Sequence, residues 1–342
     1  MFKHFIKLKQ KNKQMMNTND RLTKLEYQIK YSNLYKKLIE HKNLYSNYLS
    51  KEPILTINMP TYNGEQYIAK ALESILMQET TYVYKIKIFD DKSTDNTVKI
   101  AEEYKKLYPD IIEIIVNDKN EKGKTVGYKI YNSINTKYWM NFDQDDYWLS
   151  IDKLQRLIEF LERNETFTLA SSACYIKTSN KLSPGLCKKC DWNLKFGFEY
   201  PMTLGVLLQT SATIFRNVFT ESDLIKINNY KNTKEEPAIW GDTFRNIFAL
   251  SKGKGYFENS LDSVYNWVET GTWSKLNSGQ QAFYNLEQMY YLINFFDELE
   301  YKQYMKKCAL RYLKECHKKQ IMLTKEEQAK LKEFQKGLMN AK

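Results

Sequence analysis

The sequence is poor in proline and glycine, with 6 Pro and 12 Gly in 342 residues, which excludes collagen-like and low-complexity disordered chains. It also has no run of about 20 apolar residues, the length that a membrane span needs. The mean hydropathy is −0.62, yet 42% of the residues are hydrophobic, and a chain of this length can bury a large core. We therefore expect a globular protein without a membrane span.

Cysteine is scarce as well. An odd number of cysteines, five, favours reduced thiols over a disulfide framework. The single CxxC at Cys187 and Cys190 lacks the second ligand pair of a structural zinc site. The first residues show no apolar core and cleavage site of a secretory signal. We expect a cytoplasmic protein, either free or peripheral on the inner face of the cytoplasmic membrane.

Basic residues are in excess, with a net charge of +11, and most of the excess lies in residues 1–50. Apolar residues recur there from Leu22 to Leu49 at spacings near three to four or seven, which predicts a basic amphipathic helical extension, either one helix or a helical hairpin. Its polar face either lies in water or contacts an anionic membrane surface. No nucleic-acid-binding motif is present, so we expect no nucleic-acid partner.

From residue 51 short apolar runs alternate with helical periodicity, which predicts an α/β fold with a largely parallel sheet. Strands are expected at 54–59, 83–89, 111–116 and 138–142, and helices at 65–77, 96–106 and 125–134. Residues 280–342 read as helices again. That last region can pack on residues 20–50, form a homodimer contact or flank a substrate site, and the sequence does not choose among these.

Acidic residues follow two of the expected strands. Asp90 and Asp91 end the second strand, and Asp143, Asp145 and Asp146 follow the fourth. The ligand crevice of an open α/β sheet lies at the carboxyl ends of its strands, so these carboxylates should converge. Such a cluster needs a compensating cation. Oxygen ligands favour Mg²⁺ or Mn²⁺, and Mg²⁺ commonly completes its shell with substrate phosphates, so a nucleotide diphosphate is the natural partner.

Three motifs in order, followed by Asp152-Lys153-Leu154, resemble the family 2 inverting glycosyltransferases over about residues 53–275. The motifs are Met59–Asn63, Phe89–Thr97 and Asp143–Trp148. The resemblance implies the GT-A fold, a Rossmann-like mixed or parallel sheet flanked by helices. It divides residues 51–279 into a nucleotide-binding half, 51–150, and an acceptor half, 151–279, with helical extensions at 1–50 and 280–342.

The same resemblance assigns donor-site roles. Residues lining the base and ribose pocket would be Thr61, Tyr62 and Asn63, and Asp91 would read the nucleobase. The acidic group would hold the ribose and the metal, with Asp143 and Asp145 at the nucleotide and Asp145 and Asp146 as the metal ligands. The implied cofactor is Mn²⁺ or Mg²⁺, and the implied donor is a UDP or dTDP sugar.

The segment Glu235–Phe244 resembles the catalytic segment of the family, in which Asp242 would be the general base. Inverting transfer needs one carboxylate to take the proton of the acceptor hydroxyl as it attacks. The alternative for Asp242 is an N-cap of a helix at 243–250. Trp240 and Trp273 offer flat apolar faces to a sugar or acceptor; core packing is an equal alternative for Trp273 and the favoured interpretation for Trp240.

The resemblance therefore implies a metal-dependent inverting hexosyltransferase. It would move a sugar from a nucleotide-diphosphate sugar to a hydroxyl of a growing lipid-linked or surface glycan, as in capsule or lipopolysaccharide assembly. The alternative is a non-catalytic nucleotide-sugar-binding or membrane-docking module on the same fold. A nucleotidyltransferase would carry a basic glycine-rich loop after the first strand, and Pro60–Gly64 is not such a loop.

Overall fold

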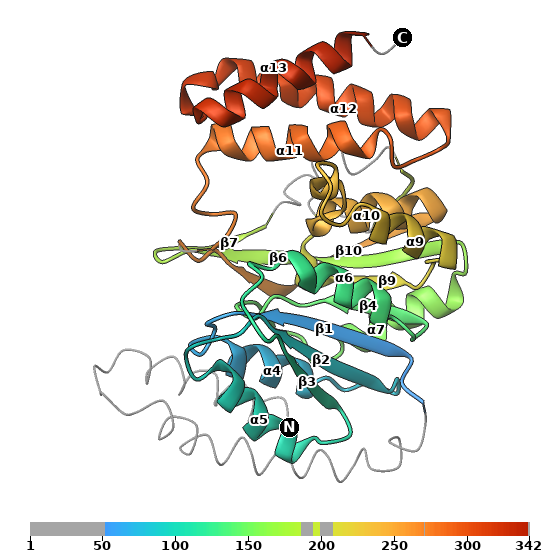
Figure 1. Ribbon diagram of the computed structural model, residues 1–342. Coiled ribbons are helices and arrows are strands. Elements are labelled where there is room, and N and C mark those ends of the chain that lie inside the picture. Colours follow the sequence, from blue (N-terminus) through green and yellow to red (C-terminus); the bar gives the residue numbers. More distant parts are fainter. Residues whose placement is uncertain (1–51, 186–193, 199–207, 270, 341–342) are drawn as a thin grey trace. The chain divides into compact units, whose positions relative to one another are not determined.

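A mixed ten-stranded sheet forms the centre of the part of the chain that the computed structural model describes, residues 52–185, 194–198, 208–269 and 271–340 (Figure 1). The strand order is β3-β2-β1-β4-β9-β6-β10-β5, with β7 beside β6 and β8 beside β10. The strands are β1 Leu55–Thr61, β2 Tyr84–Asp90, β3 Ile112–Val116, β4 Tyr138–Asn141, β5 Tyr147–Trp148, β6 Phe167–Lys177, β7 Leu182–Pro184, β8 Leu194–Phe196, β9 Thr213–Arg216 and β10 Lys254–Asn266.

Helices cover the sheet and continue beyond it. The α-helices are α4 Ile68–Leu76, α5 Thr97–Leu107, α6 Lys124–Ser133, α7 Lys153–Arg163, α9 Glu221–Asn229, α10 Gly241–Lys252, α11 Ser278–Leu292, α12 Leu299–Lys318 and α13 Lys325–Asn340. Short 3₁₀ turns are η2 Thr210–Ala212, η3 Glu236–Ile239 and η4 Gln320–Met322. The helix and strand alternation expected for residues 51–150 is confirmed.

The first half of the sheet is parallel. Strand β1 pairs in parallel with β2 and with β4, and β2 pairs in parallel with β3. Both faces of β1 are covered, because Leu55, Ile57 and Met59 on one face and Thr56 and Asn58 on the other are all buried. Coverage on both faces is typical of parallel sheets, and it brings the carboxyl ends of these strands to one edge.

The second half of the sheet is mixed. Strand β9 runs antiparallel to β4 and to β6, whereas β10 runs parallel to β6. Strand β5, which directly follows the acidic motif, pairs antiparallel with the end of β10. Because of this pairing, the acidic motif Asp143–Asp146 lies beside the C-terminal end of β10, which is more than 100 residues away in the sequence.

The C-terminal helices share a core with the second half of the sheet. Phe283 and Leu286 of α11 and Phe334 of α13 belong to the same buried cluster as Phe215 of β9 and Phe248 of α10. Figure 1 shows α11, α12 and α13 stacked beyond α10. A capping box begins α13, since Thr324 N–H donates to Glu327 Oε2 over 2.7 Å and Glu327 N–H donates to Thr324 Oγ1 over 3.2 Å. The region predicted to be helical after residue 280 is therefore helical.

The predicted basic extension at residues 1–50 lies outside the described residues. Within the described part of the chain, the helices are too short or too polar to span a bilayer.

Candidate active site

The loop after β1 is tied to the loop after β2. Buried Thr61 donates its hydroxyl hydrogen to Asp90 Oδ1 over 3.1 Å. Asn63 adopts φ +46°, accepts a hydrogen bond from Thr94 N–H at 2.8 Å and donates its own N–H to Ser93 Oγ at 2.9 Å. The Tyr62 ring stays 45% exposed. The three residues predicted to line a base and ribose pocket thus form one braced loop with an exposed aromatic face.

Gln144 joins this loop to the acidic motif after β4. Tyr62 N–H donates to Gln144 Oε1 over 3.2 Å, and Gln144 Nε2 donates back to Tyr62 O over 2.9 Å. The amide lies across Gly64, where a Cβ would come within 2.0 Å of Gln144 Oε1. Sequence reasoning missed this residue, and its position inside the acidic motif was the signal available.

Asp91 is engaged in holding the loop that precedes α6. Its carboxylate accepts hydrogen bonds from Asn117 Nδ2 at 2.8 Å, Glu121 N–H at 2.9 Å and Gly123 N–H at 2.8 Å. Burial alone would raise the pKa of Asp91, but these hydrogen bonds outweigh it and lower the pKa. Asn117 in turn accepts a hydrogen bond from Lys129 Nζ at 2.5 Å. Nucleobase recognition by Asp91 stays a prediction.

The acidic group gathers at the carboxyl edge together with Asp242. Burial raises the pKa of Asp143 to about 7, the charges of Asp145 and Asp242 add to that rise, and Arg245 opposes it. Burial also raises the pKa of Asp145. Burial raises the pKa of Tyr265, and the charges of four carboxylates, those of Asp146, Asp143, Asp145 and Asp242, add to that rise. The sheet therefore brings Asp242 within electrostatic reach of the acidic motif.

Asp146 differs from its neighbours because hydrogen bonds brace it to the fold. It is 1% exposed and accepts from Gln209 Nε2 at 2.5 Å, Ser211 Oγ at 2.6 Å and Asn266 N–H at 2.9 Å. Burial, with the charges of Asp143 and Asp145, raises its pKa well above the ordinary value. These three donors occupy the Asp146 carboxylate, and the metal-ligand role of Asp145 and Asp146 stays a prediction.

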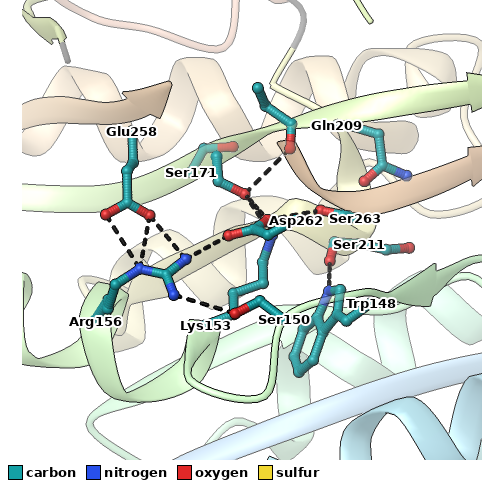
Figure 2. A network of polar contacts seen from close by, with 12 residues as sticks. Trp148, Ser150, Lys153, Arg156, Ser171, Gln209, Ser211, Glu258, Asp262 and Ser263 are labelled. Atoms are coloured by element: carbon teal, nitrogen blue, oxygen red, sulfur yellow. Dashed lines mark hydrogen bonds and ion pairs between the residues drawn. The ribbon is translucent and has the colours of Figure 1, made fainter. Parts of the chain in front are cut away.

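Ser211 connects this brace to the rest of the site. Its Oγ donates to Asp146 and accepts Asp143 N–H at 2.9 Å, and its carbonyl accepts Trp148 Nε1–H at 2.6 Å (Figure 2). The 3₁₀ turn η2, directly before β9, therefore holds both ends of the acidic segment Asp143–Asp146 in place. Sequence reasoning missed Ser211 and Gln209, since neither lies near a recognised motif.

The donor set fits a divalent cation that arrives with a diphosphate. Among the described residues no three His, Cys, Asp or Glu side chains are arranged to hold a metal by themselves. The carboxylates of Asp143 and Asp145 would offer oxygen ligands to such a cation, since Mg²⁺ is commonly held by one or two carboxylates plus substrate phosphates. Arg245 is buried and donates to Thr210 Oγ1 over 3.4 Å, and its charge favours ionised Asp143.

Asp242 lies in the first turn of α10, and the N-cap residue is Trp240 rather than Asp242. The N-cap interpretation of Asp242 is therefore wrong, because Gly241, at φ +72°, already belongs to the helix. Within the described part of the chain, its half-buried carboxylate forms no hydrogen bond or ion pair. The carboxylate lies within electrostatic reach of Asp143, and its role as a base stays a prediction.

Trp240 and Trp273 are 37% and 39% exposed, so neither is a core residue and the packing alternative is wrong for both. Gln288 of α11 donates to Trp240 O, and Gln281 of the same helix donates to Trp273 O over 3.2 Å. Helix α11 thus supports both segments. The role of each indole toward a sugar or acceptor stays a prediction.

The Asp152-Lys153-Leu154 motif begins α7 and anchors it. Lys153 is fully buried, and its Nζ donates to Asp262 Oδ1 over 2.7 Å, Ser172 Oγ over 2.5 Å and Ser263 Oγ over 2.7 Å. Arg156 Nη2 donates to Asp262 Oδ2 over 2.6 Å (Figure 2). The motif ties α7 to β6 and β10 behind the acidic edge.

Comparison with known proteins agrees with this geometry. Residues 56–221 match the family described as Glycosyl transferase family 2. The dTDP-rhamnosyl transferase RfbG of Shigella flexneri is 39% identical over 119 residues, which cover 33% of this chain and 40% of RfbG. The putative teichuronic acid biosynthesis glycosyltransferase TuaG of Bacillus subtilis is 30% identical over 118 residues, 34% of this chain and 46% of TuaG.

Among solved structures, S. aureus TarS 1-349 in complex with UDP aligns with a TM-score of 0.53 at 15% identity, covering 76% of this chain and 70% of that one. That likeness shows a shared fold. The chain spans less than half the length of the curated relatives RfbG and TuaG. Through residues 56–221, the chain belongs to glycosyl transferase family 2, and its described part has the GT-A fold.

Proposed function

We propose that the chain is a metal-dependent inverting glycosyltransferase with Asp242 as the general base. The observation that carries the proposal is the convergence of Asp242 on Asp143 and Asp145 at the carboxyl edge of the sheet. A donor diphosphate at Asp143 and Asp145 would then lie close to a carboxylate able to deprotonate an acceptor.

The proposed reaction needs a single displacement. The Asp242 carboxylate takes the proton of the acceptor hydroxyl while the hydroxyl oxygen bonds to the anomeric carbon, opposite the departing nucleotide diphosphate. A divalent ion bound at Asp143 and Asp145 would supply charge stabilisation for the leaving diphosphate. The brace on Asp146 would hold that pair in place, and no covalent enzyme intermediate is required.

The donor is proposed to be a UDP or dTDP sugar. The exposed Tyr62 ring and the Asn63 loop offer a surface for the base and ribose. RfbG is named as a dTDP-rhamnosyl transferase, and TarS was solved with UDP. These names support a nucleotide-sugar donor of this class and do not distinguish the uracil from the thymine nucleobase. The acceptor is proposed to be a lipid-linked or surface glycan on the cytoplasmic side of a membrane, in line with the name of TuaG.

Thermal stability against a panel of nucleotides tests the donor site. Purified protein is heated with UDP, dTDP, GDP and their sugars, each with Mn²⁺ and with EDTA. A ligand at a hundredfold excess over its Kd stabilises the native state by about 2.7 kcal/mol. We expect a metal-dependent shift with UDP or dTDP compounds, and a folded sample that responds to none of them would refute the donor site.

Asp242→Asn tests the base. Loss of general-base catalysis should lower kcat by about 10²–10⁴-fold, while the donor-induced thermal shift stays within a degree of wild type. Glu221→Gln, a change in the first turn of α9, is the matched control and should retain full activity. Wild-type turnover by Asp242→Asn would remove the base assignment. A wild-type protein that binds donor but transfers to no acceptor would favour the non-catalytic module.

A further inference from the structure

One face of α12 is basic from Gln303 to Lys318. At 100° per residue, eight side chains of this stretch share the face, and none of them is acidic: Gln303, Lys306, Lys307, Leu310, Arg311, Lys314, His317 and Lys318. Glu300 and Leu299, one turn earlier, begin the same face. The first six of these residues line a shallow hollow of about 490 Å³. The opposite face, with Met305, Ala309 and Cys316, is buried against the neighbouring helices. The basic face is therefore the outer face of α12.

The turn after α12 adds exposed apolar side chains to the same end of the helix. Ile321 is 96% exposed and Met322 is 45% exposed. Lys318 and Lys319 precede this turn, and Lys325 follows it. An almost fully exposed isoleucine gains nothing from the fold of this chain, whereas it would gain from an apolar environment supplied by a partner.

This turn is attached to the start of α11, which follows the Trp273 loop. Asn277 Nδ2 donates to Met322 O over 3.0 Å, and Lys319 Nζ donates to Ser278 O over 3.4 Å. A Cβ at Gly279 would come within 2.7 Å of Met322 Cβ, so the two segments are in close contact. Figure 1 shows the turn between α12 and α13 at the same end of the helical layer as the start of α11.

We propose that the basic face of α12, together with the Ile321–Met322 turn, docks on an anionic lipid bilayer. The lysines match the charge of the headgroups, and the two apolar side chains reach the acyl boundary, which is the combination that interfacial binding uses. A soluble polyanion would match the charge but would leave Ile321 in water. Docking here would bring the Trp273 loop close to a membrane surface that carries a lipid-linked acceptor.

This surface includes no residue of the 1–50 extension, and docking at it does not depend on the proposed transfer reaction. Its test therefore measures binding rather than turnover. The full-length chain is sedimented with vesicles of phosphatidylcholine alone or with 30% phosphatidylglycerol, at low and high salt. The wild-type protein should bind the anionic vesicles, with binding that weakens at high salt. Absence of binding to anionic vesicles would overturn the inference.

Charge reversal on α12 tests the basic face. Because each cation near an anionic surface strengthens binding about fivefold, Lys307→Glu/Lys314→Glu should weaken vesicle binding at least tenfold. The matched control is Lys332→Glu/Lys336→Glu, which changes the net charge equally at exposed positions of α13. Equal loss in both pairs would mean that only net charge matters, and would overturn the assignment to α12.

Substitution at the turn tests insertion. Ile321→Glu/Met322→Glu should lower vesicle binding about tenfold, with an effect that persists at high salt. Leu182→Glu/Ile225→Glu is the control, because it adds the same two charges at exposed apolar positions outside α12, Leu182 at 55% and Ile225 at 56% exposed, and should leave binding unchanged. An equal effect of this control pair, or no effect at the turn, would overturn the insertion of this turn.

Two further arms separate the other sources of binding. Lys7→Gln/Lys9→Gln/Lys11→Gln in the full-length chain measures the share of residues 1–50, and abolition of binding by this variant alone would overturn the α12 face. Inorganic polyphosphate is the soluble probe, and loss of polyphosphate binding without loss of vesicle binding in the α12 variant would assign the face to a soluble polyanion. The donor-induced thermal shift should match wild type in every α12 variant, so failure here is distinct from failure of the proposed function.

Discussion

Two groups of charged residues lie close to each other on the sheet and differ in how far their charges are paired. Around Asp262, every charge is paired: Lys153 and Arg156 both donate to its carboxylate, and Glu258 receives Arg156. At the acidic edge, Asp143, Asp145 and Asp242 raise the local negative potential with Arg245 as the opposing cation. The paired group stabilises the fold, whereas the acidic group, which lacks such pairing, is where we propose that a cation and a diphosphate bind.

The largest stability effect is expected at the paired group. Lys153→Met leaves Asp262 buried with Arg156 as its remaining basic partner, and breaking a buried ion pair costs about 3–5 kcal/mol. Urea denaturation should show this loss. Lys137→Met is the control, because the Lys137–Glu162 pair is partly exposed, at 48% and 28%, and should cost less than about 1 kcal/mol. Similar losses in both variants would contradict a special role for the buried pair.

At the acidic edge the same kind of change should act in the opposite direction on stability. Asp145→Asn removes a charge that burial disfavours, so the metal-free protein should unfold at a higher temperature at pH 8. Activity should fall at least about 100-fold, or 2.7 kcal/mol, with loss of the Mn²⁺-dependent part of donor binding. Asp110→Asn, at an exposed position, should change neither property. A destabilised Asp145→Asn protein would show that this carboxylate is structural.

Ser211→Ala tests whether the brace belongs to the site or only to the fold. It removes a donor to Asp146 and the acceptor for Asp143 N–H, and should cost about 2 kcal/mol of stability. Ser171→Ala is the matched control, because Ser171 is equally buried and pairs with Thr213 at 2.8 Å.

Both serine variants should lose similar stability, but only Ser211→Ala should weaken Mn²⁺-dependent nucleotide binding, measured by calorimetry below the melting temperature. Ser211→Thr keeps the hydroxyl and should restore that binding in part. Equal Mn²⁺-dependent nucleotide binding by Ser211→Ala and Ser171→Ala would show that Ser211 contributes to stability and not to nucleotide binding.

The smallest effect is expected at Glu73, a half-buried side chain whose carboxylate accepts a hydrogen bond from the neutral Tyr104 hydroxyl and lies near the charge of Lys70. Burial raises the pKa of Glu73 to about 7 although Tyr104 Oη donates to it over 2.7 Å. The folded state therefore favours the protonated form, and stability is full below the unfolded pKa near 4.5 and declines as the pH rises toward 7. Glu73→Gln should gain on the order of 1 kcal/mol at pH 8 and nothing at pH 4. An unchanged pH profile would contradict the raised pKa.

Much of the nucleotide-binding half could be predicted from the sequence, because its signals are local. The strand ends at Asp90 and Asn141 lie within one residue of the expected positions, since each apolar run stops at a polar cluster. By contrast, β6 was missed, because its first eight residues are buried without alternation and such a run is not diagnostic of a strand.

The composition of the acidic edge could be predicted, but its internal division of roles could not. Parallel topology alone brings Asp91 and Asp143 to one edge. The sequence gives no sign that Asp146 is held by Gln209 and Ser211. That contact forms because β9 pairs antiparallel with β4, which brings the segment before β9 beside the segment after β4. Asp145 and Asp146 are adjacent in the chain, and only three-dimensional packing distinguishes them.

The Gln144 amide lying across Gly64 has a consequence for engineering. Since the Tyr62 backbone and Gln144 hold each other through two hydrogen bonds, the loop after β1 and the loop after β4 form one exchangeable unit. A chimera that imports either loop alone would place a foreign side chain against Gly64, or a foreign residue with a Cβ at position 64 within 2.0 Å of Gln144 Oε1. Donor preference should therefore be transplanted from a relative only by moving residues 61–64 and 143–146 together.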